Sequence, residues 1–266
     1  RFFVRSIITI AGVVIVSGVI VFGALQLPAS KNLVKNYLVN EFNHQYQGQL
    51  SIDRLEGTLP LNFRFVGVEL HGPRKEAIIS GDTLIHAEAV NVSLEVWELL
   101  YGSLSVSELN IAGPDIFLRW LSDGKLSFSE VFKLNNPSAR DTPPFWENRE
   151  VWAPNISITD GAIRFDQHLL SEPAFNLPAK FELDSLAANI FLEMNPKQRI
   201  LEFESLQFSV PWIQEDKVSV TGQLYNDETV LEMNALTVES GGNSISLTGS
   251  LDSLDIYKPD IRKQLS

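Results

Sequence analysis

The four histidines, His44, His71, His86 and His168, are the first residues to examine for chemistry. None of them has a partner at a metal-ligand spacing such as H-x-x-x-H, so we interpret them as surface or strand-face residues. The sequence also contains no phosphate loop, no G-x-G-x-x-G and no G-x-S-x-G motif. We therefore expect no catalytic residue, no metal site and no cofactor, and an enzyme fits this chain poorly.

Two Asp-Gly pairs, Asp123-Gly124 and Asp160-Gly161, raise the question of a carboxylate site. Each pair stands between runs of alternating apolar and polar residues, where a hairpin needs a turn. Asp-Gly is a preferred pair in two-residue hairpin turns, because both positions take a positive φ. We therefore interpret both pairs as turns.

The composition is that of an acidic chain of 266 residues with 44% hydrophobic content, which is enough for a core. The 33 Asp and Glu outnumber the 21 Lys and Arg, which argues against binding nucleic acid or anionic headgroups through a basic patch. The sequence contains no cysteine, which excludes disulfides and thiolate metal sites. The fold must therefore depend on a core or on a long hydrogen-bonded sheet.

An uncharged stretch of 22 residues, Ser6–Leu27, lies near the start. As a helix it would cross a hydrocarbon core roughly 30 Å thick. The alternative is a cleavable signal peptide, but the apolar region of such a peptide has only roughly 7–15 residues. Arg1 and Arg5 precede the stretch, so we expect the N-terminus in the cytoplasm and the rest beyond the membrane. That exported part carries 19 Lys and Arg against 33 Asp and Glu, a net charge of −14.

A short amphipathic helix is predicted over residues 29–48, directly after the anchor. Leu33, Tyr37, Leu38 and Phe42 have helical spacing. Ser30 is the expected N-cap, and Gly48 closes the C-terminal end. Beyond this helix the apolar period changes to two.

A break in this alternation recurs along the chain. Leu104 and Val106 alternate with serines, then Ser107 and Glu108 stand together before Leu109. One inserted residue would turn the following apolar set to the other face of a strand. A β-bulge absorbs such a residue, keeps the apolar set on one face and bends the strand. The template recurs in five places, at 50–55, 104–109, 181–186, 201–206 and 231–236.

Repeated bulges predict a sheet that curves in one direction and keeps one face apolar. Leucine at this spacing is also compatible with an ordinary β-sandwich, which stays the alternative. Sandwiches show turn signals roughly every 8–12 residues, whereas the apolar-alternating runs at 61–70 and 186–194 are long. The polar residues along these runs are those expected for one wetted face.

The chain divides at a polar loop that contains four prolines, over residues 135–154. Two short helical interruptions are predicted before it, a plug at 95–102 and a turn within 124–134. The chain starts at Arg and ends without a turn or cap signal, so we expect a fragment. The expected regions are arginines and anchor (1–28), amphipathic helix (29–48), first β segment (49–134), loop (135–150), second β segment (151–258) and truncated end or tail (259–266).

The order of several motifs carries a family resemblance. These motifs are Leu55-Glu56-Gly57, Leu59-Pro60, Phe65, Gly67, Val68, Leu99-Leu100, Gly113-Pro114 and Asp123-Gly124. Over about residues 1–166 the chain resembles the AsmA-like superfamily, and within it the TamB-type translocation-and-assembly-module proteins of Gram-negative bacteria. Residues 167–258 match only as generic β repeats. The C-terminal region typical of TamB is absent, so TamB and other AsmA-like members are not distinguished.

The resemblance implies a mainly β fold, in which one transmembrane helix and a short amphipathic helix precede a long, curved, half-tubular β-sheet of repeated bulged strands that forms a groove. It implies a single-pass bacterial inner-membrane protein whose bulk is periplasmic. Such proteins look like conduits for phospholipid transport to the outer membrane and support outer-membrane protein assembly and secretion. The implied partners are the membrane, phospholipid or acyl chains, and an outer-membrane barrel protein reached through the absent C-terminal region.

An apolar groove would favour such transport, because an acyl chain costs about 0.8 kcal/mol per CH₂ exposed to water. The alternative function is a scaffold whose sheet edges template partner strands by β-augmentation, without carrying lipid. The candidate groove residues are the in-phase apolar residues Ile52, Phe63, Phe65, Val68, Val106, Ile111, Ile116, Leu118, Ile158, Ile163, Phe165, Leu183, Ile190, Phe203, Phe208, Val220 and Leu247.

Overall fold

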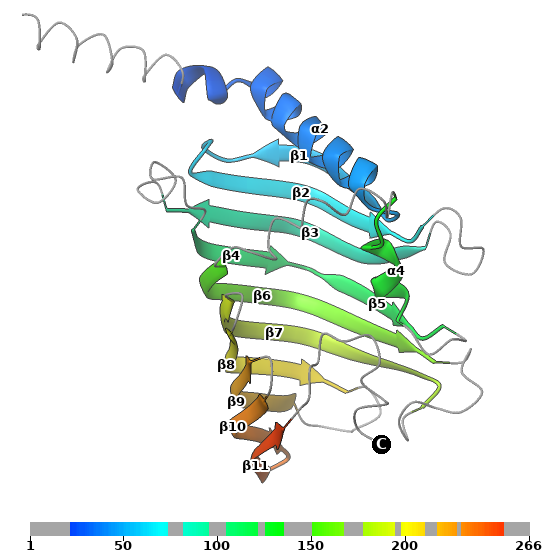
Figure 1. The fold of residues 1–266 in the computed structure, drawn as a ribbon, viewed down its shortest axis with the longest axis vertical. Coiled ribbons are helices and arrows are strands. Elements are labelled where there is room, and N and C mark those ends of the chain that lie inside the picture. The colour runs from blue at the N-terminus through cyan, green and yellow to red at the C-terminus, as the bar shows by residue number, and fades with distance from the viewer. Residues whose placement is uncertain are drawn as a thin grey trace, which may run out of the picture.

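A computed structural model describes most of the chain (Figure 1). The described residues are 22–73, 82–95, 105–121, 126–135, 151–167, 178–194, 198–210, 217–227 and 230–252. Within them all eleven strands belong to one sheet, which confirms the predicted mainly β class. The alternative of a β-sandwich, which has two sheets, does not fit. The expected anchor lies outside the described residues up to position 21. In the part of the chain that is described, no helix is long and apolar enough to cross a membrane.

The helices and strands have the following bounds. The helices are α2 (Pro28–Gln45) and α4 (Ser127–Val131). The strands are β1 (Gln49–Glu56), β2 (Asn62–His71), β3 (Thr83–Leu94), β4 (Val106–Ala112), β5 (Asp115–Arg119), β6 (Val151–Asp166), β7 (Lys180–Met194), β8 (Gln198–Ser209), β9 (Lys217–Asp227), β10 (Val230–Ser240) and β11 (Asn243–Asp252).

The sheet is two antiparallel meanders joined by one parallel junction. Strands β1 to β4 pair in chain order, as do β6 to β11. At the junction, β4 and β5 each pair antiparallel with β3 and parallel with β6. The two β segments that the sequence separates at its long loop therefore pair directly within one sheet. Figure 1 shows this sheet twisting from β1 to β11.

Strands β4 and β5 are two parts of one interrupted strand. Gly113 takes φ +55 between them, and its N–H donates to Thr159 O at 2.9 Å. Pro114 O accepts the N–H of Ala162 at 2.7 Å, so β6 continues past the interruption. The Gly-Pro pair thus changes the direction of the strand without releasing it from its neighbours.

Four of the five predicted bulges are confirmed, in β4, β7, β8 and β10, because each strand shifts register at its template. In β8, Phe203 pairs with Gly222 and Leu206 with Val220. Since Gly222 and Val220 are two residues apart in β9, they share a face. Phe203 and Leu206, three residues apart, therefore share that face too, as the bulge template requires.

The bulge predicted at 50–55 is wrong. The pairing of β1 with β2 keeps one register from Leu50 opposite Leu70 to Leu55 opposite Phe65. The reason lies in β2, whose own apolar alternation also changes phase by one residue, directly beside the phase change in β1. Gly67 stands there with φ +62, opposite the skipped residue of β1. Because both strands skip together, neither has an extra residue relative to the other.

The turn predicted at Asp160-Gly161 is also wrong, since both residues lie inside β6. Asp160 takes φ +54, and β6 shifts register against β7 between Ile158 and Gly161. Aspartate tolerates this conformation better than most residues, so the pair suits a bulge as well as a hairpin turn. Asp123-Gly124 lies outside the described residues; on either side of it, Trp120 and Leu126 form an antiparallel bridge.

Helix α2 forms as expected but begins and ends elsewhere. Its N-cap is Leu27 and Pro28 occupies the first turn, where the missing N–H of proline costs no hydrogen bond. The predicted cap is wrong: the Ser30 hydroxyl instead donates to Ala24 O at 2.7 Å. The predicted apolar stripe is split, because Leu33 and Tyr37 are exposed while Phe42 packs against the core.

Of the later interruptions, the helical turn within 124–134 is confirmed as α4. The plug at 95–102 lies outside the described residues from position 96, and the loop at 135–150 from position 136. The end of the second segment and the tail, from position 253, also lie outside them.

Candidate functional site on the apolar sheet face

One face of the sheet carries a continuous row of apolar side chains. Residues paired directly across neighbouring strands point to the same face. The register of nine successive pairings joins one apolar residue from each of ten strands. This first apolar row is Leu55, Phe65, Val90, Ile111, Ile158, Ala188, Leu206, Val220, Val238 and Ile245.

A second apolar row crosses β1, β2, β3, β5, β6 and β7 and lies on the same face. Its members are Leu50, Leu70, Ile85, Ile116, Ile163 and Leu183. We call the face that holds both rows the apolar face.

The two rows share a face because Ile158 and Ile163 do in β6. Ile158 pairs with Ala188, and Gly161 pairs with Leu186. Leu186 and Ala188 are two residues apart in β7, so Ile158 and Gly161 point the same way. Ile163 follows Gly161 by two residues and points that way as well.

All seventeen candidate groove residues lie on the apolar face by the same register argument. Sixteen of them are half-buried, and Leu247 is 47% exposed. None belongs to the buried core. The apolar face is therefore hydrophobic yet partly accessible to solvent, whereas side chains inside a closed core would be fully buried. Their role in lining a groove stays a prediction.

Aromatic pairs reinforce the apolar face at two places. The rings of Phe63 and Phe65 stack with centroids 6.1 Å apart. Phe165 and Phe181, opposite each other in β6 and β7, stack at 4.3 Å. Other members of the first apolar row, among them Val90, Leu206 and Ile245, are not among the candidate residues, because only the register identifies them.

The opposite face of the same strands is polar. A polar row runs beside the first apolar row, one residue away in each strand, and its members hydrogen-bond across strands. Asn189 Nδ2 donates to Ser205 Oγ at 3.3 Å, and Thr237 Oγ1 donates to Ser246 Oγ at 3.3 Å. The row is Glu56, Arg64, Asn91, Asn110, Ser157, Asn189 and Ser205, continued beyond the β8 bulge by Thr221, Thr237 and Ser246.

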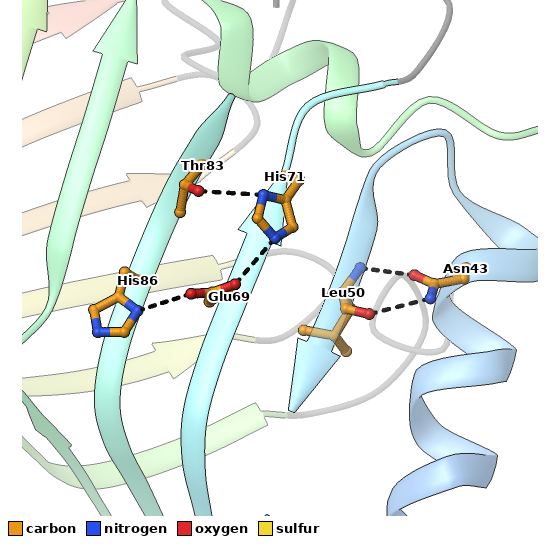
Figure 2. Close-up of polar contacts among 6 residues, drawn as sticks. All are labelled: Asn43, Leu50, Glu69, His71, Thr83 and His86. Atoms are coloured by element: carbon orange, nitrogen blue, oxygen red, sulfur yellow. Dashed lines mark hydrogen bonds and ion pairs between the residues drawn. The ribbon is translucent and has the colours of Figure 1, made fainter. Parts of the chain in front are cut away.

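Two histidines belong to this polar side of the sheet (Figure 2). His71 Nε2 lies 3.1 Å and His86 Nδ1 3.5 Å from the carboxylate of Glu69, and Thr83 Oγ1 lies 3.2 Å from His71 Nδ1. Among the described residues, no group of three or more His, Cys, Asp or Glu could hold a metal ion. His44 is exposed at the end of α2, and His168 lies outside the described residues.

The helices cover one end of the apolar face. Val131 of α4 packs against Leu70 and Leu84, with Leu50 and Ile85 beside them. Helix α2 adds Phe42, whose ring lies 5.0 Å from that of Tyr46. Burial raises the pKa of Tyr46. Among the described residues, packing thus closes the apolar face near α4.

The two edges of the sheet differ. The free edge of β1 is covered by α2, whose side chains bind its backbone: Lys31 Nζ donates to Gly57 O at 2.6 Å and Lys35 Nζ to Asp53 O at 3.0 Å. Asn43 both donates to Leu50 O and accepts from Leu50 N, at 3.1 and 2.7 Å (Figure 2). Strand β11, at the other edge, is exposed wherever its side chains are described.

A scan of family models finds none that matches the chain, and a search of curated proteins finds no match either.

Proposed function

We propose that the protein is a conduit for phospholipid, in which acyl chains lie on the apolar face and move along it from strand to strand. The observation that supports this is the first apolar row, which runs unbroken across ten strands and has seven half-buried members. We further propose that the sheet curves into a half-tubular groove. Each confirmed bulge adds a bend while it keeps the apolar set on one face.

The energetics of such a surface suit movement better than storage. Each CH₂ of an acyl chain removed from water gains about 0.8 kcal/mol, and successive strands offer similar apolar side chains. A lipid can then move to the next strand while it keeps equivalent apolar contacts. The headgroup would stay in water beside the strands.

The location of the protein in the cell is also part of the proposal. The uncharged stretch Ser6–Leu27 would anchor the chain in the bacterial inner membrane, with the sheet in the periplasm. Phospholipid would travel toward the outer membrane, where an outer-membrane barrel protein is the proposed partner. The protein would thereby support outer-membrane protein assembly and secretion, and it would not be an enzyme.

A charge on the apolar face tests the proposal. We expect Ile158→Asp to lower the phospholipid that co-purifies with the chain by about threefold or more, since acyl chains avoid a carboxylate. Mass spectrometry of the extracted lipid measures this loss. The matched control is Ser157→Asp, one residue away on the polar face, which should keep the wild-type lipid content. Circular dichroism of both variants checks the fold, and equal lipid loss in both would contradict the proposal.

The scaffold function is the second candidate, and the exposed strand β11 favours it. An open strand edge can pair with a strand of another protein. This function predicts that a proline within β11 abolishes partner binding, whereas polar substitution of Phe65 or Phe165 does little. For lipid transport the conduit predicts the opposite: polar substitution of Phe65 or Phe165 lowers transport, and a proline within β11 does little.

A further inference from the structure

Helix α2 carries an apolar patch that faces away from the sheet. Leu33 is 70% exposed and Tyr37 is 66% exposed, and Leu27 before the helix is 56% exposed. Five of the eight exposed large hydrophobic residues among the described part of the chain lie between positions 22 and 38. We define Leu27, Leu33 and Tyr37 as the outer patch. Such clustering on one short segment marks an interaction surface.

The outer patch and the sheet contacts lie on opposite sides of α2. A helix turns about 100° per residue, so Leu33 lies about 160° around the axis from both Lys31 and Lys35. Those two lysines bind the carbonyl oxygens of Gly57, directly after β1, and of Asp53 within it. The sheet therefore cannot cover the outer patch, and the lysines that could attract anionic lipid are used in covering the edge of β1.

The helical conformation is interrupted between residues 22–25 and α2. Leu27 is extended, with φ −65 and ψ 142, and separates the helical residues 22–25 from α2 (Figure 1). If α2 instead continued straight out of a bilayer, Tyr37 would stand about 15 Å beyond Leu27. The interfacial zone is only roughly 5–8 Å deep on each side, so Tyr37 would then be in water.

We propose that α2 lies against the surface of the bilayer, with the outer patch in the interfacial zone and the edge of β1 held just above it. This inference rests on the proposed anchoring of residues 6–27. The contact is apolar, because Leu and Tyr insert at the interface without needing anionic headgroups. It places the first strands of the apolar face beside the membrane from which phospholipid would enter.

Single labels test this placement in the full chain, reconstituted into phosphatidylcholine vesicles. The sequence has no cysteine, so one introduced cysteine takes one fluorophore. We compare Leu33→Cys and Tyr37→Cys with Thr221→Cys, an exposed position on the polar face of β9. Ser17→Cys, within the uncharged stretch, reports on the anchor.

The fluorophores at positions 33 and 37 should shift to the blue. Lipids that carry a spin label near the headgroup should quench them at least about twice as strongly as the fluorophore at position 221. The label at position 17 should respond most to a deep spin label. Labels at 33 and 37 that match 221, while 17 is quenched, would overturn the surface contact and leave the anchor and the conduit standing. A label at 17 that is not quenched would overturn the anchor, and this inference with it.

Discussion

Gly222 of β9 is constrained both in its backbone conformation and in the space available for a side chain. It takes φ +131, and a Cβ there would lie 2.6 Å from Leu236 Cα and 2.7 Å from Ala235 O. The contact is with the backbone of the β10 bulge, which cannot move aside as a flexible side chain would. Gly222 therefore allows β9 to approach the bulge that keeps the apolar face of β10 continuous.

We expect Gly222→Ala to lower the free energy of unfolding by about 2 kcal/mol or more, from backbone strain and steric overlap together. Urea unfolding followed by circular dichroism measures this difference. Gly249→Ala in β11 is the matched control, since a Cβ at Gly249 meets nothing within 4 Å. We expect the control to be close to neutral. A Gly222→Ala variant as stable as the control would show that the bulge yields easily.

Residue types alone predicted some of these positions and misassigned others. Asp160-Gly161 was assigned to a turn because Asp and Gly favour positive φ in turns and bulges alike. The sequence pattern identifies such a residue, but pairing with β7 decides whether the chain reverses. The two rows of the apolar face could be predicted only in part, because cross-strand neighbours depend on register.

At the scale of the element, α2 protects the edge of β1. Asn43 replaces a neighbouring strand for Leu50 by bonding both its N–H and its C=O. Unprotected edges pair with other chains, and covering an edge with a helix is one established remedy. The predicted helix is therefore present, but it lacks the single apolar stripe of an amphipathic helix, and its sheet side is held by polar bonds from Lys31, Lys35 and Asn43 as well as by Phe42.

We expect Asn43→Ala to destabilise the β1 edge by about 1–2 kcal/mol, because two backbone bonds lose their partner. Hydrogen exchange of the Leu50 amide should accelerate, which mass spectrometry of β1 peptides detects. Asn40→Ala is the control, on an exposed position of the same helix. Unchanged exchange in Asn43→Ala would mean that the lysines and Phe42 hold α2 to the sheet without Asn43.

The bulges show what one sequence can and cannot predict about an element. Four templates predicted true bulges, because beside each one a neighbouring strand uses one residue fewer over the same pairs. The template at 50–55 failed because β2 skips a residue beside it at Gly67, and a bulge is a property of a pair of strands. The strand patterns do not predict that β4 and β5 pair parallel with β6. The alternation of apolar and polar residues is the same whichever way a strand runs.

At the scale of the whole molecule, one sheet has an apolar face and a polar face along its full width. The polar row needs no covering partner, because several of its side chains hydrogen-bond across strands and polar groups are well solvated in water. The first apolar row is only half-buried across all ten strands, except where Leu55 and Ala188 are buried and Ile245 is exposed. That asymmetry is the central physical basis for placing a lipid on one face.

The most direct measurement is photo-crosslinking at adjacent residues that point to opposite faces. A benzophenone amino acid is placed at Ile111, Ile158 or Leu206 of the first apolar row, and at Asn110, Ser157 or Ser205 of the polar row. After irradiation in membranes, mass spectrometry should find phospholipid adducts at all three apolar positions and at none of the polar ones. Adducts on both faces alike, or on neither, would contradict the proposal that lipid travels on the apolar face.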